Sequence, residues 1–268
     1  MSIAREAKRI IVKVGTSTLT HPSGHINIRL MEKLVKVLSD IKNTDRELVL
    51  VSSGAIGVGV GKLGMRERPQ SIPGKQAAAA VGQCELMYLY DKYFSEYNHT
   101  VGQVLLTRYS LDDPESRQNV RNTFEALFGM GAIPVVNEND TVATDEIKVG
   151  DNDTLSAIVA QIVQADALII LSDIQGLYTA DPAQNAAAVL VPEVRVIDDA
   201  LMRTASGAGS SRGTGGMLTK LTAGRIAMAA GADMYIISGK NPDILYDLLE
   251  GEQVGTHFIG EDLWKERD

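Results

Sequence analysis

Short strand-like runs alternate with helix-like stretches along this chain, and this alternation constrains its fold more than any other feature. Arg9–Val14 is a β-branched run that ends at Gly15, which predicts a strand. Ile28–Ile41 carries apolar side chains at helical spacing, which predicts a helix. This alternation predicts an α/β fold, a three-layer αβα sandwich with a largely parallel central sheet.

The same alternation continues over most of the chain. The other predicted strands are Glu47–Val51, Thr100–Leu106, Ala132–Val136, Ala167–Leu171 and Met234–Ser238. The other predicted helices are Ile72–Tyr97, Pro114–Met130, Thr154–Val163, Gly216–Ala230 and Ile244–Glu250, with a small-residue helix after Ser52-Ser53-Gly54. Val189–Ile197 fits a hairpin arm, and the Gly-, Ser- and Ala-rich stretch Thr204–Gly216 is the candidate mobile loop.

Length and composition predict one globular domain over residues 1–268. Apolar residues make up 44% and charged residues 22% of the 268 residues, which is enough to bury a large core. The net charge of -8 argues against a nucleic-acid partner, which requires a basic face. The single cysteine, Cys84, is expected to be a small core residue and fits a reducing compartment. No apolar run suits a signal peptide or a membrane span, so a cytoplasmic protein is expected.

Polar clusters follow four of the predicted strands. They are Gly15-Thr16-Ser17, Ser52-Ser53-Gly54, Asn137–Asp140 and Ser172-Asp173. In open α/β sheets the carboxyl ends of the strands form the ligand crevice, so these clusters predict one shared site. Any one of them could instead be a solvated turn.

Two features suit a phosphate group. Lys13 lies inside an apolar strand, where a lysine is costly to bury unless it meets an anion; the alternative is an outward-facing residue on an edge strand. Gly213–Lys220 is a glycine-rich segment that leads into a helix, and free backbone N–H groups at a helix start bind phosphate. It is not a Walker A loop, and the alternative is a flexible surface loop.

Three further features define what chemistry is available. Gly150–Thr154 holds two carboxylates at a helix start, more than an N-cap needs, and Leu155 excludes an EF-hand loop. Gly59–Gly64 matches a dinucleotide-binding pattern but lies too far past its strand. The four histidines lack metal-ligand spacing and offer no obvious base. A carboxylate acceptor needs no base, because it is already ionised at pH 7.

Six segments in chain order carry a family resemblance. They are Val12–Ser17, Ser52–Ile56, Ile133–Asp140, Gly150–Asp153, Leu171–Tyr178 and Gly213–Lys220. Together they resemble the glutamate 5-kinases of the amino acid kinase superfamily. The resemblance implies the amino acid kinase fold and transfer of the γ-phosphoryl group of ATP to the γ-carboxylate of L-glutamate, the first step of proline biosynthesis.

The resemblance also implies roles for individual residues. Lys13 and Lys220 would hold the β- and γ-phosphates, and Asp153 would orient both ammonium groups. The residues expected to bind glutamate are Ser53, Asp140 and Asn152. Those expected to line the ATP site are Lys13, Ser172, Asp173, Thr214, Gly215, Gly216, Met217, Leu218, Thr219 and Lys220. Mg²⁺ would bridge the phosphate oxygens through protein ligands that the sequence does not fix.

Partners follow from the same resemblance, and alternatives to it stay open, one of them based on the Gly59–Gly64 pattern. Many members carry a C-terminal PUA domain, which is expected to be absent here because the chain ends soon after Phe258. A homo-oligomer, transfer of the product to a glutamyl phosphate reductase and feedback inhibition by proline are expected. Closure of Thr204–Gly216 over the site would exclude water. The alternatives are a kinase for N-acetylglutamate or aspartate, a dinucleotide-dependent oxidoreductase and a non-catalytic amino-acid sensor.

Overall fold

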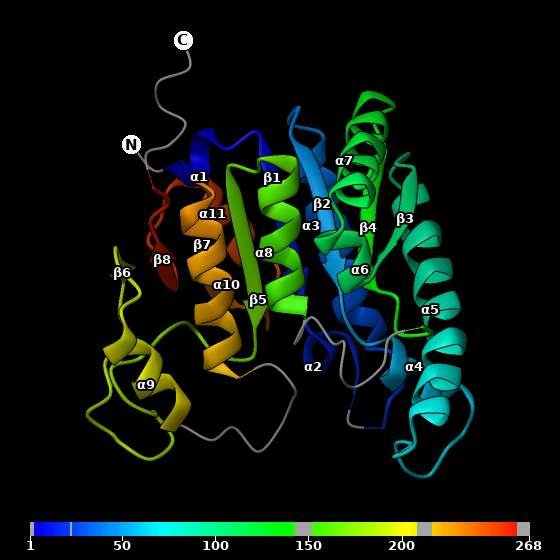
Figure 1. Ribbon diagram of the computed structural model, residues 1–268, viewed down its shortest axis with the longest axis horizontal. Helices are drawn as coiled ribbons and strands as arrows, with labels where there is room; N and C mark the ends of the chain where they lie inside the picture. Colours follow the sequence, from blue (N-terminus) through cyan, green and yellow to red (C-terminus); the bar gives the residue numbers. More distant parts are fainter. Residues whose placement is uncertain (1–2, 22, 143–151, 208–215, 262–268) are drawn as a thin grey trace. The chain divides into compact units, whose positions relative to one another are not determined.

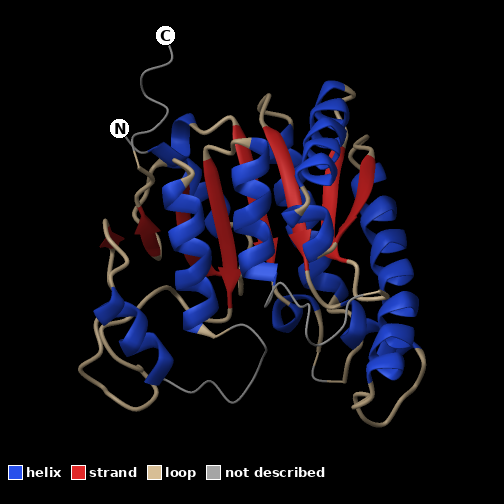
Figure 2. Ribbon diagram, viewed as in Figure 1, coloured by secondary structure: helices blue, strands red, loops and turns tan. Residues whose placement is uncertain are grey.

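The computed structural model describes residues 3–21, 23–142, 152–207 and 216–261. The chain divides into two compact units, one of residues 1–13 and 150–268 and the other of residues 14–149. Each unit contains parallel strands between helices, as the strands in red and helices in blue of Figure 2 show. The predicted α/β fold is therefore confirmed, and the prediction of one domain over the whole chain stays a prediction.

The described residues of the first unit form five strands. In sheet order they are β1 (Arg9–Val14), β5 (Ala167–Ser172), β7 (Asp233–Ser238), β8 (Thr256–Phe258) and β6 (Glu193–Val194). β5 and β7 are parallel, and β8 is antiparallel to β7. The helices are α1 (Ile3–Glu6), α8 (Asn152–Val163), α9 (Asp199–Gly207), α10 (Met217–Ala229) and α11 (Ile244–Glu250). α8 and α10 pack against each other on one face of the sheet (Figure 1).

The part of the second unit that the structure describes forms three parallel strands. In sheet order they are β3 (Val101–Leu106), β4 (Ile133–Glu138) and β2 (Glu47–Ser52). The helices are α2 (Thr16–Leu19), α3 (Ile28–Lys42), α4 (Ala55–Lys62), α5 (Ile72–Ser95), α6 (Arg108–Asp112) and α7 (Pro114–Gly129). Burial follows the sequence pattern, because β2 is an almost continuous apolar run and is buried along nearly its whole length.

Helices α4 and α5 lie in close contact because glycines face their interface. A Cβ atom on Gly59 would lie 1.8 Å from the carbonyl oxygen of Ala78, and one on Gly82 would lie 1.8 Å from that of Ala55. Gly59 and Gly61 lie inside α4, so the dinucleotide-like pattern does not open a helix after a strand. The first of these glycines allows two helices to approach each other.

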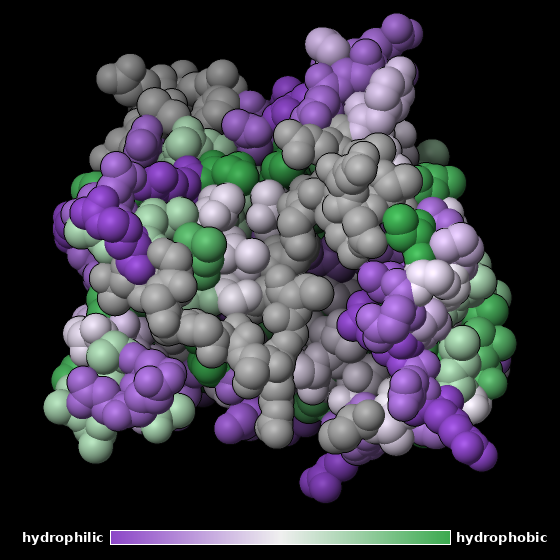
Figure 3. All heavy atoms as spheres, turned by 60° about the horizontal axis from the view of Figure 1, so that its bottom comes forward, coloured by the Kyte–Doolittle hydropathy of each residue, from purple (hydrophilic) through white to green (hydrophobic). Residues whose placement is uncertain are grey.

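The outer side of α5 is also apolar. Ala77, Ala80 and Cys84 are exposed on it, and green surface lies among white and purple surface along the right edge of Figure 3. The prediction that Cys84 is a core residue was wrong, because this thiol is exposed. A helix that is apolar on both sides gives no periodic signal that separates its buried side from its exposed side.

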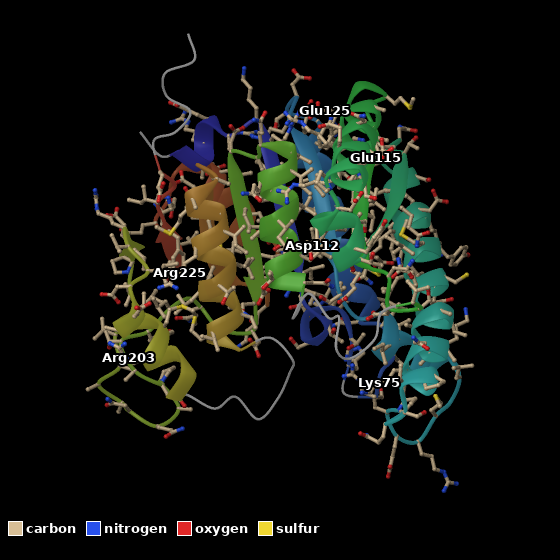
Figure 4. The ribbon with its side chains drawn as sticks, viewed as in Figure 1. Lys75, Asp112, Glu115, Glu125, Arg203 and Arg225 are labelled. Carbon is tan, nitrogen blue, oxygen red and sulfur yellow. The ribbon has the colours of Figure 1, made fainter. Side chains whose placement is uncertain are left out.

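Two other predictions are met only in part. The predicted hairpin arm Val189–Ile197 is antiparallel at its start, where Leu190 bridges Tyr178, and its later part holds the two-residue strand β6, which is parallel to β8. The predicted loop Thr204–Gly216 begins inside α9 and ends at the N-cap of α10, and residues 208–215 lie outside the described residues. Arg225 of α10, labelled in Figure 4, binds the carbonyl of Ile197 and the carboxylate of Asp199 at the start of α9. None of the described helices is long and apolar enough to cross a membrane.

Candidate functional site

A buried carboxylate lies between two buried ammonium groups in the first unit. Lys13 Nζ lies 2.6 Å from Asp153 Oδ1, and Lys220 Nζ lies 3.0 Å from Asp153 Oδ2. Asp153 is 0% exposed, Lys13 8% and Lys220 6%. The three predicted catalytic residues, which are far apart in the sequence, are therefore in direct contact.

Each of the three side chains comes from a different element. Lys13 lies near the carboxyl end of β1, Asp153 is in the first turn of α8 and Lys220 is in the first turn of α10. α8 and α10 pack against each other, which brings their first turns together. Asp153 thus belongs to the helix itself, at the amino-terminal end where a carboxylate is favoured by the helix dipole.

The charges of this cluster do not cancel. Two ammonium groups and one carboxylate leave a net charge of about +1 in a buried setting, which suits an anion such as a phosphate group. Burial raises the pKa of Asp153, but Lys13 and Lys220 outweigh this effect and hold the pKa below its ordinary value. Asp153 is therefore ionised at neutral pH and holds both lysines in place.

Thr219 makes a further contact with Asp153. Its hydroxyl lies 3.2 Å from Asp153 Oδ2 and 2.8 Å from the carbonyl oxygen of Gly216. A hydroxyl has one proton, so it can donate fully to only one of these two acceptors. Thr219 thereby links the carboxylate to the N-cap of α10.

The start of α10 supplies the other donors of the predicted phosphate site. Gly216 is the N-cap, and Met217 and Leu218 are the first two helical residues. The first backbone N–H groups of a helix lack partners within it, so this end can bind an anion beside Lys220. Thr214 and Gly215, also predicted to bind ATP, lie outside the described residues.

Ser172 and Asp173 lie at the carboxyl end of β5 in the same unit. Ser172 is buried, and its hydroxyl donates to Asp173 Oδ1 at 3.2 Å. Asp173 is exposed. The backbone here is also held to the end of β7, because Gly239 N donates to the carbonyl of Ser172 at 2.7 Å.

The residues predicted to bind the acceptor are divided between the two units. Asn152, in the first unit, is the first residue of α8, directly before Asp153. Ser53 and Asp140 are in the second unit, where Ser53 follows β2 and Asp140 lies in the turn after β4. All three are half-buried. The prediction that the strand-end clusters form one site stays a prediction.

The backbone around Ser53 is tightly fixed within the second unit. Ser53 N donates to the carbonyl of Val14 at 3.1 Å. The next residue, Gly54, has φ +105° and caps α4, a conformation that other residues rarely adopt. This explains why a glycine follows the serine pair.

Two side-chain contacts from α5 were not predicted from the sequence. Asn137 Nδ2 donates to Gln83 Oε1 at 2.8 Å, and the hydroxyls of Ser52 and Tyr90 lie 2.8 Å apart. Both strand residues lie at carboxyl ends, of β4 and β2 respectively. Gln83 and Tyr90 lie in a helix that carries no recognisable motif, so only the fold reveals these pairs.

The described residues contain no group of three or more histidine, cysteine or carboxylate side chains that could hold a metal ion. The most buried carboxylate near the lysines, that of Asp153, already faces two ammonium groups. These side chains therefore do not by themselves form a Mg²⁺ site. Mg²⁺ commonly binds substrate phosphates with few protein ligands.

Comparisons with known proteins agree with this geometry. Residues 8–238 match the amino acid kinase family. The chain is 54% identical over 261 residues to a glutamate 5-kinase of Clostridium perfringens, covering 96% of this chain and 97% of that protein. It is 55% identical over 261 residues to a glutamate 5-kinase of Listeria innocua, covering 96% and 95%.

Solved structures show the same fold at low sequence identity. The UMP kinase from Bacillus anthracis has a TM-score of 0.65 and 15% identity, covering 95% of this chain and 97% of that one. The isopentenyl phosphate kinase of T. acidophilum, in a product complex, has a TM-score of 0.60 and 18% identity, covering 93% and 99%. These likenesses show the fold alone.

Proposed function

The chain belongs to the amino acid kinase family, and from this premise we propose that it is a glutamate 5-kinase. It transfers the γ-phosphoryl group of ATP to the γ-carboxylate of L-glutamate, giving L-glutamyl 5-phosphate and ADP. The observation that carries this proposal is the buried contact of Asp153 with Lys13 and Lys220. Relatives more than 50% identical over almost their whole length carry the same name.

The reaction is a direct displacement at the γ-phosphorus. An oxygen of the glutamate γ-carboxylate forms a bond to phosphorus while the bond to the β,γ-bridging oxygen breaks, and ADP leaves. The carboxylate is ionised at neutral pH, so no proton is removed and no general base is needed. Catalysis then depends on positioning and on stabilising charge on the transferred group.

Lys13 and Lys220 supply the positive charge for this step. Their ammonium groups contact the β- and γ-phosphate oxygens and stabilise the charge that develops on the leaving ADP. Asp153 fixes both groups before the substrates arrive, so they need little reorganisation during the reaction. The first turn of α10 and the Ser172–Asp173 segment line the rest of the ATP site.

The acceptor is bound by Ser53, Asp140 and Asn152. The carboxylate of Asp140 pairs with the α-ammonium group of glutamate, because a hydrogen bond between opposite charges is stronger than one between neutral groups. Asn152 directly precedes Asp153 in α8, so binding of glutamate there places the acceptor next to the lysine cluster. Free glutamate is thereby favoured over N-acetylglutamate, which lacks the positive charge.

The proposal also includes the compartment, the pathway step and the partners of the enzyme. The enzyme acts in the cytoplasm in the first step of proline biosynthesis, with Mg²⁺ accompanying ATP. Its product is passed to a glutamyl phosphate reductase, proline inhibits it and the chain forms a homo-oligomer. The kinase forms a single domain over residues 1–268.

The test is acyl-phosphate formation, trapped by hydroxylamine as a coloured hydroxamate. Glutamate, N-acetylglutamate and aspartate are compared with ATP and Mg²⁺. Signal with glutamate alone supports the proposal. Hydroxamate formed only with N-acetylglutamate or aspartate would show that this compound, and not glutamate, is the substrate. No hydroxamate with any of the three would contradict the proposed kinase activity.

A further inference from the structure

We propose that Gln83 of α5 is a positioning residue for the amino-acid acceptor and that it acts through Asn137 at the carboxyl end of β4. This inference rests on the proposed function, since it assigns a residue to the acceptor side of that reaction. Gln83, Asn137 and Asp140 all belong to the unit of residues 14–149.

The amide of Asn137 is bound at both of its ends. Its Nδ2 group donates to Gln83 Oε1 at 2.8 Å, and its Oδ1 atom accepts from Glu138 N at 2.9 Å. Asn137 is only 2% exposed. Because Gln83 presents an acceptor, the nitrogen of the Asn137 amide points toward α5 and its oxygen points toward its own strand.

This contact controls the backbone that leads to Asp140. Glu138 N is held by Asn137, and Asn139 N donates to the carbonyl of Leu106 at 2.7 Å. If Gln83 lost its acceptor, the buried Nδ2 group of Asn137 would turn toward another partner and release Glu138 N. The turn that presents Asp140 begins at this point, so acceptor affinity would fall.

One face of α5 reaches the ends of two strands. Tyr90 lies seven residues after Gln83, on the same face of the helix, and its hydroxyl lies 2.8 Å from that of Ser52. Ser52 directly precedes Ser53, the other predicted acceptor residue of this unit. Tyr90 is fully buried, whereas Gln83 is half-buried, so Gln83 can be changed without removing a large core side chain.

The test separates acceptor affinity from ATP affinity. Gln83→Met keeps the length of the side chain and removes the acceptor. We expect the KM for glutamate to rise about 5- to 10-fold, the loss of one hydrogen bond, while the KM for ATP changes less than about 2-fold. Gln83→Glu keeps an Oε1 acceptor and should return the glutamate KM to within about 3-fold of the unchanged protein.

The matched control is Gln118→Met on α7. Gln118 also pairs with an asparagine, since its Nε2 donates to Asn122 Oδ1 at 2.9 Å, but this pair is exposed. Its loss should leave both KM values unchanged. Melting temperatures of all variants separate loss of fold from loss of affinity.

Three results would overturn the inference. They are an unchanged glutamate KM in Gln83→Met, an equal rise in both KM values, and no recovery in Gln83→Glu. Failure of the proposed function can be distinguished from these results, because the unchanged protein itself would then give no hydroxamate with glutamate.

Discussion

Asp153 is the residue on which the charge balance of the lysine cluster depends. It is 0% exposed and contacts both Lys13 and Lys220, so removing its charge would take away the carboxylate that both buried ammonium groups contact. The cost of burying unpaired charge is several-fold larger than the gain from an exposed ion pair. Asp153 is therefore both a proposed catalytic-site residue and an expected determinant of stability.

Replacing Asp153 tests this dual role at the residue scale. Asp153→Asn should lower the free energy of unfolding by about 3–5 kcal/mol, because the two ammonium groups stay buried. Urea denaturation measures the change. The matched control is Asp199→Asn, which breaks an exposed pair with Arg225 and should change stability little. Equal effects of the two variants would contradict the account of the cluster.

The pKa of Asp153 gives a pH dependence with a definite sign. Its folded-state pKa is lowered from 3.8, so the carboxylate stabilises the fold above this value and the contribution is lost as pH falls through the folded-state pKa. The difference in unfolding free energy between the unchanged protein and Asp153→Asn should therefore narrow as pH falls below 3.8. Denaturation series at neutral and acidic pH measure this difference, and one that stays constant would contradict it.

At the scale of elements, the contact between α4 and α5 holds the strand ends of the second unit. α4 begins directly after Ser53 and Gly54, and α5 binds Asn137 and Ser52. The glycines that allow this contact carry no periodic signal, so the sequence predicted both helices but not their separation. Packing of this kind depends on how closely the two helix backbones approach each other, and the spacing of apolar side chains does not predict that distance.

A single methyl group tests the contact. Gly59→Ala would place a Cβ atom 1.8 Å from the carbonyl oxygen of Ala78, so the helices must separate. We expect a loss of about 1–3 kcal/mol, measured by thermal unfolding. Gly129→Ala at the end of α7 is the control, because its Cβ would meet nothing within 4 Å. A stable Gly59→Ala protein would show that the two helices can separate freely.

At the scale of the whole molecule, local sequence pattern predicted most strands and helices but not their contacts. β1 and α11 have the predicted bounds. In both, the local pattern of apolar residues indicates which side chains are buried and so which element forms. Lys13 was recognised because it interrupts an apolar strand. The ion pair of Asp153 with Lys220 could not be derived from spacing, since 67 positions separate them. β8 was missed because a strand of three residues is too short to show a period, and α9 was missed because its second half falls in the stretch Thr204–Gly216 that was predicted as a loop.

Ligand binding should stabilise the whole molecule if the lysine cluster binds phosphate. ATP with Mg²⁺ at about 100 times its dissociation constant adds roughly 2.7 kcal/mol, which raises the melting temperature by a few degrees. Lys13→Met should reduce this shift. An equal shift in Lys13→Met would place the nucleotide phosphates away from Lys13.

The most direct measurement is the kcat of glutamate-dependent hydroxamate formation in Lys220→Met. Loss of one preorganised charge in the transition state should lower kcat about 100- to 1000-fold. The control is Lys36→Met, which changes an exposed lysine of α3 and should leave kcat unchanged. If Lys220→Met kept the kcat of the unchanged protein, the cluster of Lys13, Asp153 and Lys220 would not be the site of phosphoryl transfer.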